Sequence, residues 1–171
     1  MRSIKLSILS ITLLLLALST LAQKSVTIKV LQTSDVHGAV FPYDFIRNQP
    51  MDASLANVYS YVKQERANVN QQLILLDNGD ILQGQPPVYF SNFIDDTKQN
   101  LISRVFNFMK YDATTIGNHD IETGPKVYRS IEKQLKMPLM AANAINTKTG
   151  KPAFKPYTII KKDGVKIAVL G

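Results

Sequence analysis

Short apolar runs alternate with stretches of helical periodicity along most of this chain, and that alternation constrains the fold more than any other feature. Four runs have the length and the apolar or β-branched composition of strands: residues 26–32, 73–76, 113–116 and 139–142. Three stretches space their apolar side chains as amphipathic helices do: residues 52–69, 101–110 and 125–136. Strands that alternate with helices predict an α/β domain, and the unbroken apolar run at residues 73–76 is typical of a parallel sheet.

Proline and glycine mark the remaining segments. Gln85-Pro86-Pro87 predicts an irregular segment, because proline lacks a backbone donor, and residues 149–152 predict a loop. Residues 157–161 and 165–170 predict a hairpin around Lys162-Asp163-Gly164. In an open α/β sheet, ligands gather outside the carboxyl ends of the strands. Because the last strand ends at the end of the sequence, we expect the domain to be truncated before a further functional loop.

The N-terminus has the pattern of a secretory signal peptide. Arg2 and Lys5 precede an apolar run at residues 8–18, and Ala22 closes the segment. The run is shorter than the roughly 20 apolar residues that a transmembrane helix needs, so cleavage is favoured over a membrane anchor. We therefore predict a signal peptide at residues 1–22 and an exported, periplasmic or secreted chain at residues 23–171 without a stable membrane anchor.

Composition limits the function classes. The chain contains no cysteine, which excludes disulfides and a lipidated N-terminal cysteine. Its formal net charge is +7, but the lysines are scattered and no dense basic block with interleaved aromatic residues is present. The sequence therefore predicts no nucleic-acid polymer as a partner.

Three polar motifs follow the predicted strands: Asp35-Val36-His37-Gly38, Gly79-Asp80-Ile81-Leu82-Gln83-Gly84 and Gly117-Asn118-His119-Asp120. The only two histidines of the chain lie in these motifs. Asp35 and His37 are two residues apart at a strand end, so we expect both side chains to point the same way. A carboxylate and an imidazole on one side form half of a site for a divalent transition metal.

The other two motifs add further ligand types. A buried carboxylate at Asp80 would be costly unless it is paired or bound to a metal, although an ordinary turn residue is an alternative. Asn118 offers a carbonyl oxygen, and His119 offers a ring nitrogen or a proton. A capping or loop role for His119 is the alternative that its position after an apolar strand makes less attractive.

Taken in order, Asp-x-His, Gly-Asp and Gly-Asn-His-(Asp/Glu) resemble the calcineurin-like metallophosphoesterases. Residues 31–38 and 77–86 are similar to the exported branch that contains 5′-nucleotidases and 2′,3′-cyclic-nucleotide 2′-phosphodiesterase/3′-nucleotidases. Residues 142–157 look most like the cyclic phosphodiesterase members. The resemblance covers essentially all of residues 23–171 and implies the N-terminal portion of a four-layer α/β/β/α sandwich.

The resemblance also implies a role for each motif residue. Asp35 and His37 would bind a first divalent ion, Asp80 would bridge two ions, and Asn118 would bind the second. His119 would act on the phosphate as a catalytic residue. Zinc, manganese, cobalt and iron all suit mixed oxygen and nitrogen ligands without thiolates.

Two departures from the family pattern bear on the site. Glu122 stands where many members carry the aspartate that orients the catalytic histidine, and Asp120 is a competing partner of His119. Later loops of the family supply further metal-binding histidines, but this sequence has none after His119. The resemblance therefore implies that the site needs residues beyond this sequence and that this fragment is inactive alone.

The leading hypothesis is a metal-dependent phosphoester hydrolase that acts on nucleotides through a water activated by two metal ions. Two alternatives remain open. One is an exported, non-catalytic binding protein or inactive fragment of the same fold, and the other is a hydrolase of different phosphoesters such as sugar phosphates. The sequence does not separate a 5′-nucleotidase from a 2′,3′-cyclic-nucleotide phosphodiesterase/3′-nucleotidase.

Overall fold

The computed structural model describes residues 25–171. The predicted signal peptide at residues 1–22 lies outside this part of the chain. Within residues 25–171, no helix combines the length and the apolar character that crossing a membrane requires.

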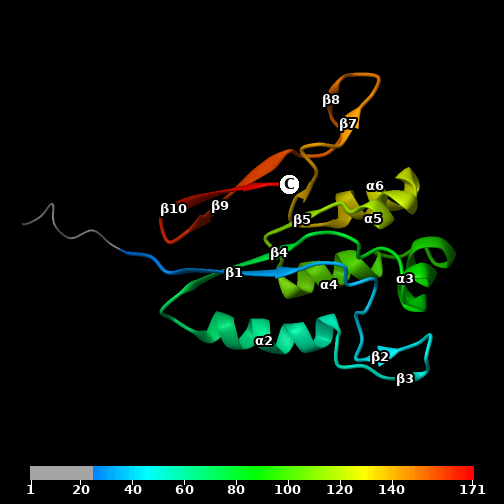
Figure 1. Cartoon of the computed structure of the whole chain (residues 1–171), viewed down its shortest axis with the longest axis horizontal. Coiled ribbons are helices and arrows are strands. Elements are labelled where there is room, and N and C mark those ends of the chain that lie inside the picture. The colour runs from blue at the N-terminus through cyan, green and yellow to red at the C-terminus, as the bar shows by residue number, and fades with distance from the viewer. Residues whose placement is uncertain (1–24) are drawn as a thin grey trace, which may run out of the picture.

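Four parallel strands form the central sheet, in the order β1-β4-β5-β6. They are β1 (Ile28–Thr33), β4 (Gln72–Asp77), β5 (Ala113–Thr115) and β6 (Leu139–Met140). The prediction of an α/β domain with a parallel sheet is confirmed. Because all four strands run the same way, their carboxyl ends lie at one edge of the sheet (Figure 1).

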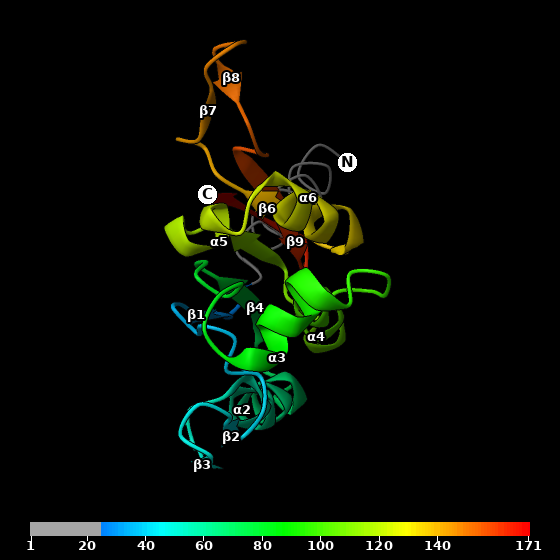
Figure 2. The same cartoon turned by 90° about the vertical axis from the view of Figure 1, so that its right-hand side faces the viewer.

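The predicted helices are also present, each slightly shorter than its apolar pattern: α2 (Leu55–Ala67), α4 (Leu101–Met109) and α6 (Pro125–Gln134). Ser54 caps α2, since its hydroxyl accepts a hydrogen bond from the amide of Asn57 at 3.4 Å. Helices α2 and α4 cover one face of the sheet (Figures 1 and 2). The main core lies there and includes the buried side chains of Leu75 and Phe106.

The predicted C-terminal hairpin is formed by β9 (Tyr157–Lys162) and β10 (Val165–Leu170). It lies on the opposite side of the sheet from α2 and α4 (Figure 1). An ion pair between Lys162 Nζ and Asp112 Oδ1, at 2.9 Å, ties it to the segment before β5. The order of helices, parallel sheet and hairpin corresponds to part of the predicted sandwich.

Two local predictions need correction. The segment that begins Gln85-Pro86-Pro87 is helical, with α3 (Pro86–Tyr89) followed by the π-helix η1 (Phe90–Ile94). The two prolines occupy the first turn, where no intrahelical donor is needed. Lys151–Pro152 is not loop but strand β8, paired with β7 (Ile145–Asn146).

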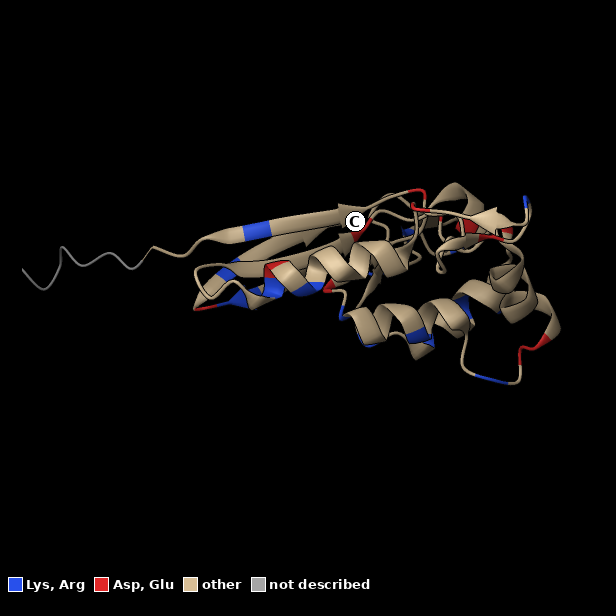
Figure 3. Ribbon diagram, turned by 90° about the horizontal axis from the view of Figure 1, so that it is seen from below, with Lys and Arg blue, Asp and Glu red and all other residues tan. Residues whose placement is uncertain are grey.

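A hairpin of β2 (Tyr43–Asp44) and β3 (Gln49–Pro50) was not predicted, because two-residue strands leave no periodic pattern. Lysine and arginine positions are distributed over several elements, among aspartate and glutamate positions, along the ribbon in Figure 3.

Candidate metal centre

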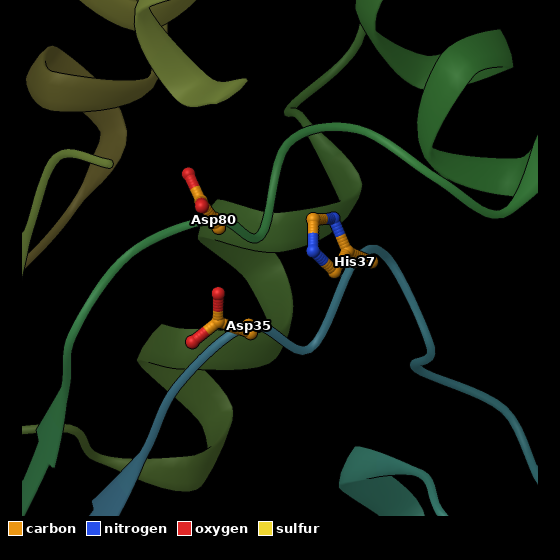
Figure 4. Close-up of side chains that lie close together, drawn as sticks. All are labelled: Asp35, His37 and Asp80. Atoms are coloured by element: carbon orange, nitrogen blue, oxygen red, sulfur yellow. The ribbon is translucent and has the colours of Figure 1, made fainter. Parts of the chain in front are cut away.

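The loops after β1 and β4 bring Asp35, His37 and Asp80 together at the carboxyl edge of the sheet. Each side chain offers one ligand atom, and these atoms all lie within 4.8 Å of one another. Figure 4 shows Asp35 and His37 on the loop after β1 and Asp80 on the loop after β4. The amide of Asp35 donates to the Gly79 carbonyl at 3.1 Å, and the amide of His37 donates to the Asp80 carbonyl at 2.9 Å. These backbone hydrogen bonds join the two loops.

The backbone places these side chains differently from the prediction. Strand β1 ends at Thr33, so strand alternation does not align Asp35 with His37. Instead Asp35, His37 and Asp80 adopt left-handed conformations with φ of 54°, 49° and 55°. Only six non-glycine residues of the described range 25–171 have positive φ, and half of them are these candidate ligands. Such conformations cost up to about 1–3 kcal/mol each and persist where the surrounding structure imposes them.

Asn118 extends the cluster from the third motif, where the short helix α5 (Asn118–Glu122) replaces the expected strand-end loop. With its amide oxygen toward Asp80, that oxygen lies 3.3 Å from Asp80 Oδ2, and two acceptors face each other. With the amide turned over, Nδ2 donates to the same oxygen at 3.3 Å. In either orientation the Asn118 amide lies beside the Asp80 carboxylate, and the carboxylate, imidazole and amide donors of the cluster fit a divalent metal ion.

Close backbone approach requires glycine at the junction of these loops. A Cβ at Gly117 would lie 2.1 Å from Asp80 Oδ1 and 2.6 Å from the Asp80 amide nitrogen. A Cβ at Gly84 would lie 2.1 Å from the His37 carbonyl oxygen. The spacing of the motifs along the sequence did not predict these contacts. The glycines within the motifs were the feature that could have indicated a close backbone approach.

We predict that Gly117→Ala weakens metal binding at least about tenfold. Gly117 has φ of −89°, which alanine adopts freely, so the effect comes from the collision with Asp80 alone. Titration with Mn²⁺ measures it. Gly150→Ala is the control, because its φ of +66° strains alanine but nothing lies within 4 Å of the added Cβ. Unchanged Mn²⁺ affinity in Gly117→Ala would contradict the prediction.

His119 is paired with Glu122 and not with Asp120. Its Nδ1 donates to Glu122 Oε2 at 2.9 Å, and the same oxygen accepts from Gln83 Nε2 at 3.2 Å. This hydrogen bond to the Glu122 carboxylate raises the pKa of His119 above its usual value. The ring lies beside that of His37, with centroids 5.4 Å apart. The His119–Glu122 pair therefore stands next to the candidate ligands.

Asp120 instead organises the backbone between the motifs. Its carboxylate is buried and accepts four backbone hydrogen bonds of 2.8–2.9 Å, from the amides of Asp80, Ile81, Leu82 and Gly117. Sequence reasoning treated it only as a possible partner of His119. Tertiary packing buries Asp120, and its carboxylate therefore binds backbone amides instead of His119.

Asp77 is a second buried carboxylate, and the sequence did not single it out. It accepts hydrogen bonds from the hydroxyls of Thr33 at 2.7 Å and Thr114 at 2.9 Å, and from the Gly79 amide at 3.0 Å. Burial outweighs these bonds and raises the pKa of Asp77 to about 6. Its position at the end of an apolar strand was the available signal.

The raised pKa of Asp77 predicts a pH-dependent stability. The folded state holds this proton up to about pH 6, whereas the unfolded chain releases it near the ordinary aspartate pKa of 3.8. The free energy of unfolding should therefore fall between about pH 4 and 6 by roughly 2–3 kcal/mol on account of this group. Urea unfolding of wild type and Asp77→Asn across that range measures the difference. Parallel stability curves for the two proteins would refute the prediction.

Fold and site together define an α/β domain that carries acid, imidazole and amide ligands at the carboxyl ends of parallel strands. Residues 28–170 match the calcineurin-like phosphoesterase family, and the chain belongs to that family.

Two curated relatives illustrate the branch. The chain is 30% identical over 146 residues to a 2′,3′-cyclic-nucleotide 2′-phosphodiesterase/3′-nucleotidase of Haemophilus influenzae, covering 84% of this chain and 22% of that protein. It is 34% identical over 158 residues to Protein UshA of Escherichia coli, covering 91% of this chain and 27% of that protein. The chain thus spans about a quarter of the length of these relatives.

Solved structures agree with the family fold. The calcineurin-like phosphoesterase YfkN from Bacillus subtilis aligns with a TM-score of 0.69 and 31% identity, over 82% of this chain and 45% of that chain. A putative 5′-nucleotidase from Staphylococcus aureus aligns with a TM-score of 0.71 and 27% identity, over 84% of this chain and 28% of that chain.

Proposed function

We propose that this chain forms part of a metal-dependent phosphoester hydrolase that acts on nucleotides. The observation that carries the proposal is the convergence of Asp35, His37 and Asp80 within 4.8 Å at the carboxyl edge of the sheet. Relatives named as a cyclic-nucleotide phosphodiesterase/3′-nucleotidase and as a 5′-nucleotidase support nucleotides as the substrate class.

Each candidate ligand has a proposed role. Asp35 and His37 would hold a first divalent ion, Asp80 would be shared with a second, and Asn118 would hold the second through its amide oxygen. When bound, two such ions lower the pKa of a water and neutralise phosphoryl oxygens. The residues fit zinc, manganese, cobalt or iron, since they supply oxygen and imidazole nitrogen without thiolates.

His119 is the proposed catalytic residue. Glu122 holds Nδ1 at 2.9 Å, which orients the ring and leaves Nε2 to face the phosphate. The raised pKa keeps more of the imidazole protonated near neutral pH. A protonated ring can stabilise negative charge on the phosphoryl group and give a proton to the leaving oxygen.

The ligand count favours a larger catalytic unit. Within residues 25–171, the four proposed ligands give each of two ions fewer protein donors than the four to six that such ions take. We propose that residues 23–171 are the N-terminal portion of an exported catalytic domain whose remaining ligands lie further along the protein. Because residues 25–171 supply so few ligands, we also consider a second candidate function for these residues alone, namely weak metal binding without catalysis.

Metal removal tests the proposal. The full-length protein, stripped with a chelator, is expected to lose hydrolysis of AMP and bis(p-nitrophenyl) phosphate and to regain it with Mn²⁺ or Zn²⁺. Residues 23–171 alone should bind these ions weakly and show no turnover. Hydrolysis by the full-length protein that survives complete chelation would refute the metal-dependent mechanism.

A further inference from the structure

Side chains bind both the amides and the last carbonyl of the segment Asp80–Leu82. Its three amides donate to the buried carboxylate of Asp120 at 2.8–2.9 Å. The Leu82 carbonyl accepts a hydrogen bond from Asn92 Nδ2 at 2.7 Å. This segment follows the end of β4 and pairs with no strand of the described residues 25–171. The side chains of Asp120 and Asn92 therefore help to fix its conformation, together with the hydrogen bond from the His37 amide to the Asp80 carbonyl.

Asn92 lies in the π-helical turn η1 and is only 5% exposed. Asn100 Nδ2 donates to Asn92 Oδ1 at 2.7 Å, which fixes the orientation of the Asn92 amide with Nδ2 toward Leu82. Asn100 also caps α4, since its Oδ1 accepts from the Ile102 amide at 2.9 Å. A continuous chain of hydrogen bonds therefore links the N-terminus of a core helix to the loop that carries Asp80. A π-helical turn is a rare element that often occurs at functional sites.

We propose that Asn92 is a positioning residue of the metal centre. It acts through the Leu82 carbonyl and keeps the Asp80 carboxylate within reach of the other ligands. The proposal rests on the proposed metal site. Asn92 belongs to none of the three motifs, and no property of the sequence predicted its role. Residues that orient metal ligands from the outer shell typically contribute about 10–100-fold to metal affinity.

Two substitutions of Asn92 distinguish the effect of its hydrogen bond to Leu82 from the effect of its packing. Asn92→Ala removes the amide, and Asn92→Asp keeps its size but replaces the donor with an acceptor. Asn107→Ala is the matched control, because it removes the same atoms from a part-buried asparagine in the last turn of α4 that makes no hydrogen bond to the segment Asp80–Leu82. The Asn107 amide bonds the Gln134 carbonyl and the Lys136 amide, at 2.9 and 2.8 Å.

The first measurement needs no metal. In the metal-free full chain, hydrogen exchange of the peptide covering residues 80–84 should become about tenfold faster in both Asn92 variants. It should stay unchanged in Asn107→Ala. If this peptide exchanges at the wild-type rate in both Asn92 variants, the proposal is overturned. If Asn92→Ala does not fold, the result for Asn92→Asp decides.

The second measurement is the dissociation constant for Mn²⁺, compared at equal folded fraction. We expect binding to be about 10–100-fold weaker in the Asn92 variants and within about twofold of wild type in Asn107→Ala. Equal losses in all variants would show a merely structural role and overturn the proposal. A wild-type chain that binds no Mn²⁺ would instead refute the metal site, and the exchange measurement would still decide whether Asn92 holds the segment.

Discussion

Replacing Asp80 by asparagine is expected to deplete both metal ions and abolish hydrolysis in the full-length protein. Asp80 Oδ1 already accepts the His119 amide at 2.9 Å, and Oδ2 lies opposite the Asn118 amide. The variant loses the negative charge and one of the two oxygens that can bridge ions. We expect Mn²⁺ binding at least about 100-fold weaker, above the range of outer-shell changes.

Metal content after dialysis and Mn²⁺ titration measure this effect. Asp52→Asn is the control, since Asp52 is an exposed carboxylate in the same groove of about 560 Å³ as Asp35 and His37. It removes the same charge without removing a ligand, so its metal content should equal that of wild type. Full metal content in Asp80→Asn would show that Asp80 does not bridge the ions.

Replacing His119 by alanine should lower turnover about 10²–10⁴-fold, the usual contribution of a general acid. Metal content should remain nearly intact, because Asp35, His37, Asp80 and Asn118 are the proposed ligands. Steady-state kinetics and metal analysis on the same sample measure the two effects. Loss of metal from this variant would mean that His119 is a ligand.

Glu122→Gln tests the protonation of His119 without removing its ring. It keeps the ring but removes the carboxylate that raises the pKa of His119. The fraction of protonated imidazole near neutral pH should fall, so the alkaline limb of the pH–rate profile should move to lower pH. A profile that does not move would show that the 2.9 Å contact does not control the protonation of His119.

The sheet and the convergence of the motifs could be predicted because both follow from local patterns. Four apolar runs specified the parallel strands, and motifs at their carboxyl ends had to share one edge of the sheet. The resemblance supplied the order of ligands. The resulting cluster of Asp35, His37 and Asp80 lies where strand ends meet, as expected.

Features that depend on packing between distant segments could not be predicted. The sequence indicated neither the burial of Asp120 and Asp77 nor the hydrogen bonds that their carboxylates accept. Asn92 lies in no motif, and its contact with Leu82 depends on a helix type that has no sequence signature. Asp35 and His37 lie together as predicted, but strand alternation is not the reason, because the chain leaves β1 at Thr33, before either residue.

The left-handed backbone at Asp35, His37 and Asp80 limits which substitutions these positions can accept during evolution without damage to the fold. Glycine and asparagine enter this region at low cost, whereas β-branched residues do not. Metal binding separately requires a donor side chain. Drift to asparagine or glycine would therefore leave a folded domain with a weakened site, whereas drift to valine or isoleucine would damage both. A relative that has lost catalysis but kept its shape should carry the first kind of change at these positions.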